Sequence, residues 1–485
     1  MTILLTIAVY FGILLLISWL TGRSGNDAFF RGNRQSPWYV VAFGMIGASL
    51  SGVTFVSVPG MVLTIDMTYM QMCMGFFFGY MLVAFVLLPL YYRHGLTSIY
   101  SYLGDRLGKR SYKTGASFFL LSKFTGAAAR LYLVCLILQQ YVSDDFGVPF
   151  SVTVVAVLLL IWLYTRRSGI RTLVWTDSLQ TFVLFSALVL ILVKTCSLLD
   201  LGFGDAISAV WNDTHGRVFE FSDLTSRQHF LKQFFSGVFI VIVMTGLDQD
   251  MMQKNLTCKN LRDAQKDMCS YGILFIPANF LFLSLGVLVT MLYSKYGMAL
   301  PEASDNLLPG IIAGGQMGSM VLVLFVVGII ASAFSSADSA LTALTTSFCI
   351  DILEVENPKS RFFKDAEWTR KKTHLVVMVV FVAFILGFKA LNDTSVIDAI
   401  YTIAGYTYGP LLGLFTFGMF THRHLRDRYV PFIAMASPLI CYAIDFITTR
   451  TTGYRFGYEL LMLNGLFTFI GLFAVSRKRL IRSRR

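Results

Sequence analysis

The sequence predicts an all-α integral membrane protein with about thirteen transmembrane helices. Of its 485 residues, 55% are apolar and only 14% carry a formal charge, against about 25% charged residues in an ordinary soluble domain. So few charges cannot cover the surface of a soluble protein of this size, which excludes a cytosolic enzyme and also a disordered or collagen-like chain. The mean hydropathy of +0.66 agrees with a membrane protein.

Thirteen apolar stretches are long enough to cross a bilayer, which takes about 20 mostly apolar residues per helix. They cover residues 2–21, 37–60, 68–92, 113–142, 148–165, 173–199, 231–251, 269–294, 316–348, 375–391, 395–420, 430–447 and 456–475. The first stretch has no basic segment before it and no small-residue cleavage site after it, so we expect a retained helix rather than a signal peptide. No loop reaches the roughly 100 residues that an appended catalytic domain needs.

The basic residues predict the orientation, because Lys and Arg gather on the cytoplasmic side of membrane proteins. With the N-terminus outside, 30 of the 40 basic residues fall in cytoplasmic segments, 7 fall outside and 3 lie within spans. We therefore expect a plasma-membrane protein with an outside N-terminus, a cytoplasmic C-terminus and a basic tail that suits anionic lipid headgroups. The net charge of +12 is spread over seven segments, which argues against a nucleic-acid partner.

Two of the stretches contain residues that interrupt helices. Discontinuous helices near the bilayer midplane form the sites of many secondary transporters, whereas Gly and Pro are also simply common in membrane helices. We expect interruptions in 37–60 and in 395–420. The interrupting residues are Gly44, Gly47, Gly52, Pro59 and Gly60 in the first stretch and Gly405, Gly409 and Pro410 in the second.

Hydroxyl side chains form a stripe along residues 327–348. Such a face suits tight packing of small residues, and it equally suits a hard cation, which takes several oxygen ligands. Asp338 lies within the stripe, and an ionisable residue at mid-span is costly unless it faces a cavity or a partner, so the pattern favours an ion site. The six hydroxyl residues at helical spacing are Ser332, Ser335, Ser336, Ser339, Thr342 and Thr346.

Other charges also fall within or beside the spans. Asp177 lies just inside the inner end of its helix, and for Asp248 and Asp250, near another inner end, we expect hydrogen bonds to a neighbouring loop. Lys123 and Arg130 are seven residues apart and therefore share a helix face. Arg130 is predicted either to pair with an acid such as Asp338 or Asp177, or to face a substrate path.

Catalytic and metal-binding motifs are absent from the sequence. The six His residues have no metal-ligand spacing, and HEXXH, Walker A and GxSxG motifs do not occur. The seven Cys residues include no CxxC pair. We expect neither an enzyme nor a cofactor, and the missing Walker A motif argues against an ATP-driven pump.

Seven motifs follow one another between Asp27 and Phe420. They are DAFFRGNRQSPWY (27–39), GASLSGVTFVSVPG (47–60), GLTSIYSYLGDRLG (95–108), GIRTLVWTDSLQ (169–180), DQDMMQK (248–254), ASAFSSADSAL (331–341) and IAGYTYGPLLGLFTFG (403–418). With these seven motifs in this order, the sequence resembles the sodium:solute symporter family. This group includes the sodium/glucose, sodium/proline and sodium/sialic-acid cotransporters.

The resemblance implies a LeuT-like core of five plus five helices in an inverted repeat, with one extra helix before the core and two after it. The chain would then divide into an N-terminal helix and inner loop (1–36), the transport core (37–420) and two C-terminal helices with the basic tail (421–485). A monomer is expected. The implied activity is sodium-driven uptake of a solute by alternating access, and an uncoupled sensor or channel on the same fold is the alternative.

The resemblance also implies a sodium site between the first and eighth core helices. Its ligands, carried over by position, are the carbonyls of Gly47, Leu50 and Ser332 and the hydroxyls of Ser335 and Ser336.

Some family members bind a second sodium ion, which here would use Asp177, Ser335, Asp338 and Ser339. One well-matched pattern has Ser in place of Asp338, so this acid would strengthen sodium binding, admit a proton or serve as a counter-charge to Arg130.

The solute is expected to be a sugar or a sugar acid such as sialic acid, with an amino acid or a monocarboxylate as the alternative. Ser49, Ser51 and Thr54 match polar positions of sialic-acid-type members. The arginine that those members use for the carboxylate would fall at Gly126, one turn from Arg130.

An amide-bearing position of the family falls at Cys73, and Gln71 is nearby. Gln71 and Arg130 therefore complete the candidate solute-binding set.

Overall fold

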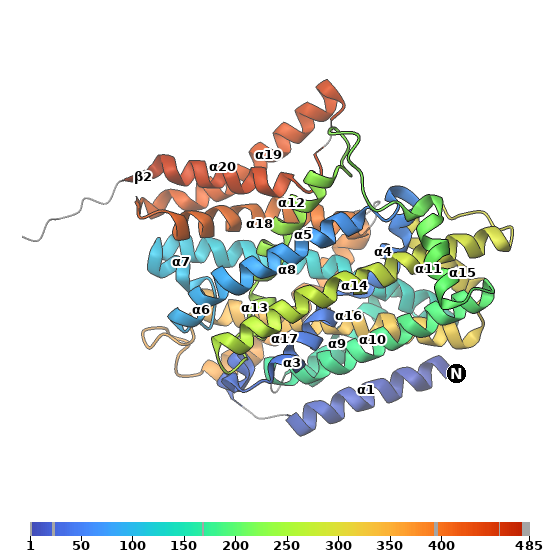
Figure 1. Ribbon diagram of the computed structural model, residues 1–485. Helices are drawn as coiled ribbons and strands as arrows, with labels where there is room; N and C mark the ends of the chain where they lie inside the picture. Colours follow the sequence, from blue (N-terminus) through green and yellow to red (C-terminus); the bar gives the residue numbers. More distant parts are fainter. Residues whose placement is uncertain (1, 22–24, 167–168, 392–395, 455, 478–485) are drawn as a thin grey trace, which may run out of the picture.

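The computed structural model describes residues 2–21, 25–166, 169–391, 396–454 and 456–477, which form a bundle of helices (Figure 1). The basic tail beyond residue 477 lies outside the described residues, as do Arg23, Arg167 and Arg455 of the charge count. The long helices are α1 (Thr2–Thr21), α3 (Trp38–Ser49), α4 (Gly52–Ile65), α5 (Tyr69–Leu82), α8 (Lys109–Leu138), α9 (Phe150–Thr165), α10 (Ile170–Leu198), α12 (Phe230–Val241), α14 (Leu261–Lys295), α16 (Ser319–Ser347), α17 (Ala366–Leu391), α18 (Val396–Phe420), α19 (Val430–Thr452) and α20 (Leu460–Val475).

Short elements connect these helices. The π-helical turns include η2 (Val83–Leu87), η6 (Ile242–Gly246) and η8 (Phe348–Ile352), and the short strands β1 (His424–Leu425) and β2 (Ser476–Arg477) pair antiparallel beside α20. The short helices are α2 (Asn26–Arg31), α6 (Leu88–His94), α7 (Ser101–Arg106), α11 (Phe203–Asn212), α13 (Gln249–Asn255) and α15 (Leu307–Ala313).

A helix or a run of consecutive helices covers each of the thirteen predicted stretches. Within the described residues, seven helices are long and apolar enough to cross a membrane, or nine if each bent pair counts as one span. Three further apolar helices, Ala8–Thr21, Phe150–Thr165 and Leu460–Val475, are shorter. A helical protein that crosses the membrane many times is therefore confirmed, whereas the count of thirteen stays a prediction.

The first predicted interruption is present between α3 and α4, whose axes are bent by 57°. The chain leaves the helix at Leu50 and Ser51, where ψ reaches 69° and 172°. Pro59 and Gly60 do not interrupt α4, which continues to Ile65. A second bent pair, Phe230–Gly246 with Gln249–Asn255, turns by 69°, and the sequence interpretation did not include this break.

The predicted interruption of 395–420 is wrong, because α18 is one helix through Pro410. Proline has no N–H and leaves the carbonyl four residues earlier without its helical donor. Here the Asn464 amide on α20 donates to the Tyr406 carbonyl over 3.0 Å and to the Gly405 carbonyl over 2.9 Å. A neighbouring helix thus satisfies the freed backbone, and the helix does not need to open.

Helix α16 forms the centre of the bundle, and 72% of its apolar window is buried. It packs on α10, α8, α3 and α4, and α10 packs in turn on α3. Helix α1 lies along the edge of the bundle beside α10 (Figure 1). This arrangement places the hydroxyl stripe of α16 in contact with the break between α3 and α4.

Candidate functional site

The broken helix and the hydroxyl stripe meet through direct hydrogen bonds. The Ser332 hydroxyl donates to the Leu50 carbonyl, and the Ser336 hydroxyl donates to the Ala48 carbonyl over 2.9 Å. The side chain of Ser332 is fully buried and that of Ser336 is 6% exposed. Backbone and hydroxyl oxygens therefore converge at the last turn of α3, which is the kind of ligand that a hard cation prefers.

Gly47 allows α3 to lie close to α10, and this position lets the end of α3 contact the hydroxyl groups of α16. A Cβ atom at Gly47 would lie only 2.0 Å from the Thr181 hydroxyl oxygen on α10. The Thr181 hydroxyl itself donates to the Asp177 carbonyl over 2.7 Å. The glycine is therefore required by the contact between the two helices.

Ser335 points to a different neighbour from Ser332 and Ser336. Its hydroxyl donates to Asp177 Oδ1 over 2.7 Å, and Lys254 Nζ lies 2.8 Å from Asp177 Oδ2. The side chains of Asp177 and Lys254 are each 1% exposed. Of the predicted sodium ligands, the Leu50 carbonyl and the Ser336 hydroxyl thus lie at this contact, and the Ser335 hydroxyl is directed to an acid. Ser332 contributes its hydroxyl here, whereas the prediction used its carbonyl.

Asp338 makes its contacts away from Arg130. The Tyr164 hydroxyl on α9 donates to Asp338 Oδ2 over 2.7 Å, and the Ser339 hydroxyl donates to Oδ1 over 3.3 Å. Among the described residues Asp338 makes no ion pair with Arg130. The same holds for Asp177, whose cation is Lys254, so the predicted pairing of Arg130 with either acid is absent from this structure.

Asp248 and Asp250 face Lys123 inside the bundle rather than a loop, which corrects the sequence interpretation. Lys123 Nζ lies 2.7 Å from Asp250 Oδ2 and 3.2 Å from Asp248 Oδ1. The Tyr408 hydroxyl on α18 donates to Asp248, which also accepts the Asp250 N–H over 2.9 Å at the start of α13. The break before α13 brings these carboxylates into the bundle, where α13 packs on α16 and α3.

A cavity of about 830 Å³, including the space at its mouth, lies beside the break. Helices α3, α5, α8, α14, α16 and α18 contribute to its wall, together with the segment from α12 to α13. The polar groups that line it include Ser49, Lys123, Arg130, Asp248 and Ser336. Among the described residues, Arg130 is the cation on this wall that has no carboxylate within ion-pair distance.

Ser49 and Arg130 are the two residues of the predicted solute set that reach this cavity. The Ser49 hydroxyl hydrogen-bonds the Tyr271 hydroxyl on α14, which also accepts from Tyr80 over 2.8 Å. The side chains of Ser51 and Thr54 are buried outside the lining of the cavity.

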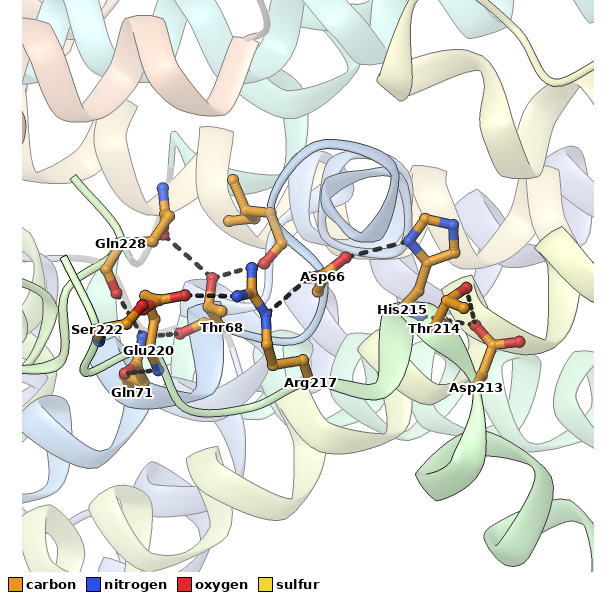
Figure 2. A network of polar contacts seen from close by, with 11 residues as sticks. Asp66, Thr68, Gln71, Asp213, Thr214, His215, Arg217, Glu220, Ser222 and Gln228 are labelled. Atoms are coloured by element: carbon orange, nitrogen blue, oxygen red, sulfur yellow. Dashed lines mark hydrogen bonds and ion pairs between the residues drawn. The ribbon is translucent and has the colours of Figure 1, made fainter. Parts of the chain in front are cut away.

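Gln71 lies in a separate polar network that joins the start of α5 to the loop of residues 213–228 (Figure 2). Its amide nitrogen donates to the Gln228 carbonyl over 2.8 Å, and its amide oxygen accepts the Glu220 N–H over 3.0 Å. In the same network Asp66 binds His215 Nδ1 over 3.2 Å and Arg217 Nε over 3.1 Å. The Gln71 amide is therefore committed to holding this loop.

Hydrogen bonds also set the ionisation of the loop acids. The Ser222 hydroxyl and backbone N–H, and then the Arg217 guanidinium, lower the pKa of Glu220 below its ordinary value. The Thr225 hydroxyl and backbone N–H lower the pKa of Asp223. Both acids are therefore held as carboxylates.

Lys254 is the main feature that the sequence interpretation missed. It stands in the quoted DQDMMQK motif, and its position beside a predicted inner helix end placed it among the cytoplasmic loop charges. The structure places it inside the bundle, in α13, 1% exposed. Within the described residues, no group of three or more His, Cys, Asp or Glu side chains could hold a metal ion.

Comparisons with known proteins find a matching family model and several relatives. The model of the sodium:solute symporter family matches residues 29–427. The sodium/sialic acid symporter NanT of Aliivibrio fischeri is 26% identical over 83% of the chain and 79% of its own length. The sodium/sialic acid symporter SiaT of Proteus mirabilis is 26% identical over 82% of the chain and 80% of its own length.

The human sodium/iodide cotransporter is a more distant relative, 24% identical over 82% of the chain and 62% of its own length. A solved structure of a Na+-coupled sialic acid symporter, in its substrate-bound outward-open state, superposes with a TM-score of 0.79 at 21% identity and covers 99% of both chains. This likeness establishes a shared fold.

Proposed function

The chain belongs to the sodium:solute symporter family, and from this premise we propose that it imports a sugar acid such as sialic acid together with sodium by alternating access. Sodium is then the only coupling ion, and no cofactor takes part. The membrane potential contributes about 2.3 kcal/mol per positive charge per 100 mV to inward movement. The protein is a transporter rather than an enzyme.

The observation that carries the proposal is the contact between α16 and the break after α3. Two buried hydroxyls, from Ser332 and Ser336, already bond the carbonyls of Leu50 and Ala48. A sodium ion bound at this point is coordinated by the two carbonyl oxygens that now accept these hydrogen bonds. The hydroxyl groups rotate so that their oxygens coordinate the same ion. Ser335 joins the set once its bond to Asp177 opens, and Gly47 keeps α3 close to α10.

Arg130 supports an acidic solute over a neutral sugar. Lys123 on the cavity wall is already neutralised by Asp248 and Asp250, whereas Arg130 has no such partner among the described residues. A guanidinium recognises a carboxylate through two parallel hydrogen bonds. We propose that Arg130 and Ser49 contact the solute, in place of the full predicted set.

The positions of the two broken helices support an inverted repeat. The bent pair α3–α4 begins the first group of five predicted spans, and α12 with α13 begins the second group. Equivalent breaks at the start of both halves are expected when one half repeats the other in inverted topology. Thirteen spans, an outside N-terminus and a monomer remain part of the proposal.

A transport assay tests the proposal. The purified protein is first screened for thermal stabilisation by sugars, sugar acids and amino acids, with and without sodium. It is then placed in proteoliposomes with an inward sodium gradient and given radiolabelled sialic acid. We expect accumulation with sodium outside and none with potassium outside.

A double variant and a matched control make this assay specific. Ser332→Ala with Ser336→Ala is expected to abolish sodium-driven accumulation. Ser284→Ala, which removes a buried hydroxyl without a hydrogen-bond partner in the described structure, is expected to leave it intact. Unaltered uptake by the double variant would refute the sodium site, and solute flux that never exceeds equilibrium would favour the channel alternative.

A further inference from the structure

Lys254 is a buried cation at the acid where the resemblance implies a second sodium ion. Its Nζ atom lies 2.8 Å from Asp177 Oδ2, and both side chains are 1% exposed. Removing two charges from water is costly and is offset only by close pairing. The ammonium and the carboxylate therefore stabilise each other inside the bundle.

The remaining oxygens of the implied second site are also occupied by protein donors. Asp177 Oδ1 accepts the Ser335 hydroxyl over 2.7 Å. Asp338 accepts the hydroxyls of Tyr164 and Ser339, over 2.7 Å and 3.3 Å. Neither acid lines the cavity beside the break, and the Asp177 carboxylate is already paired with the Lys254 ammonium.

We infer that the Lys254 ammonium takes the place of the second sodium ion, so that the protein binds one sodium ion at a time. The inference rests on the proposed function, because the one ion is the sodium at the break after α3. A sodium ion at Asp177 would meet the positive charge of Lys254 at close range in a region of low dielectric constant. A tethered ammonium cannot leave the protein, and it therefore adds no driving force from the sodium gradient.

The number of bound sodium ions tests the inference without knowledge of the solute. Purified full-length protein is titrated with radioactive 22Na+ alone, in potassium chloride that keeps the ionic strength constant. We expect saturation at one ion per chain and a Hill coefficient near 1. Saturation at two ions would overturn the inference and leave the proposed function intact, whereas no saturable binding would overturn both.

Variants of the pair identify the lysine as the cause. Lys254→Met is expected to raise saturation to two ions per chain, because Asp177 then needs a new cation. Lys259→Met, which removes an exposed lysine close by in the chain, is expected to stay at one. Saturation at one ion in folded Lys254→Met would overturn the inference.

A paired variant keeps the test decisive if Lys254→Met does not fold. Asp177→Asn combined with Lys254→Met removes both charges, and it is expected to bind one sodium ion with an affinity within about threefold of the wild type. Loss of all sodium binding in this folded variant would place the single ion at Asp177 itself and overturn the inference.

Discussion

Replacing Gly47 by Ala is expected to weaken sodium binding by moving α3 away from α10. The added Cβ would lie 2.0 Å from the Thr181 hydroxyl oxygen, 2.9 Å from the Thr181 Cβ and 3.0 Å from its Cα. Ordinary contacts begin at 3.4 Å, so the first of these distances must grow by about 1.4 Å. The close approach of backbone on the Thr181 side means that a rotamer change alone cannot provide the space.

The size of the effect follows from the cost of overpacking, about 1–3 kcal/mol in a well-packed interior. Helix α3 carries the carbonyls of Ala48 and Leu50 that face Ser336 and Ser332. If the strain is relieved by moving these carbonyls, the sodium concentration at half-saturation rises by about 5- to 150-fold.

The assay is a sodium titration of thermal stability, with Gly387→Ala as the control because a Cβ at Gly387 meets nothing within 4 Å. Combining Gly47→Ala with Thr181→Ala removes the closest contact and is expected to recover part of the affinity. Wild-type half-saturation and melting temperature in Gly47→Ala would refute the reasoning. No recovery in the double variant would show that Thr181 is not the obstacle.

Three further predictions concern the cavity, α18 and the loop that follows η8. Arg130→Gln is expected to weaken binding of a carboxylate solute by about 10- to 150-fold, since a hydrogen bond to a charged group contributes about 1.5–3 kcal/mol; equal loss for a neutral sugar would contradict this. Asn464→Leu removes the side-chain donor that serves the Tyr406 carbonyl in place of the missing proline N–H, at a cost of about 1–3 kcal/mol, and an unchanged melting temperature would contradict the account of α18. The Lys113 hydrogen bond, followed by that of Lys109, lowers the pKa of Glu354 from 4.5 to about 2. The ion pair between the Glu354 carboxylate and these lysines therefore stabilises the folded protein above about pH 4.5, and this stabilisation is lost as the pH falls toward 2. Glu354→Gln should cost about 0–1 kcal/mol at pH 7, and a deficit that persists at pH 2 would exclude this ion pair as the cause.

The hydroxyl stripe illustrates what local pattern predicts well. Residues three and four apart share a helix face whatever surrounds the helix, so the spacing of Ser332 and Ser336 was enough to place both on one side of α16. The structure confirms this, since both bond the last turn of α3. A break between 37 and 60 was likewise predicted from its glycines.

The interruption of 395–420 illustrates where local pattern fails. Pro410 does free a carbonyl, as expected, but the sequence does not say which distant group reaches it. Asn464 is 54 positions away from Pro410 in the chain and lies beside it only because α20 packs on α18. Gln71 is a similar case, because its partners come from the loop of residues 213–228 (Figure 2).

The sequence by itself determined the class of the protein, its family and the helix that carries the hydroxyls, because composition and helical period are local properties. Only the tertiary structure decided which charges meet: Lys254 with Asp177, and Lys123 with Asp248 and Asp250. Partner choice depends on how the bent segment before α13 turns into the bundle, and on burial that makes an unpaired charge costly. Neither is encoded in the spacing of residues along one helix.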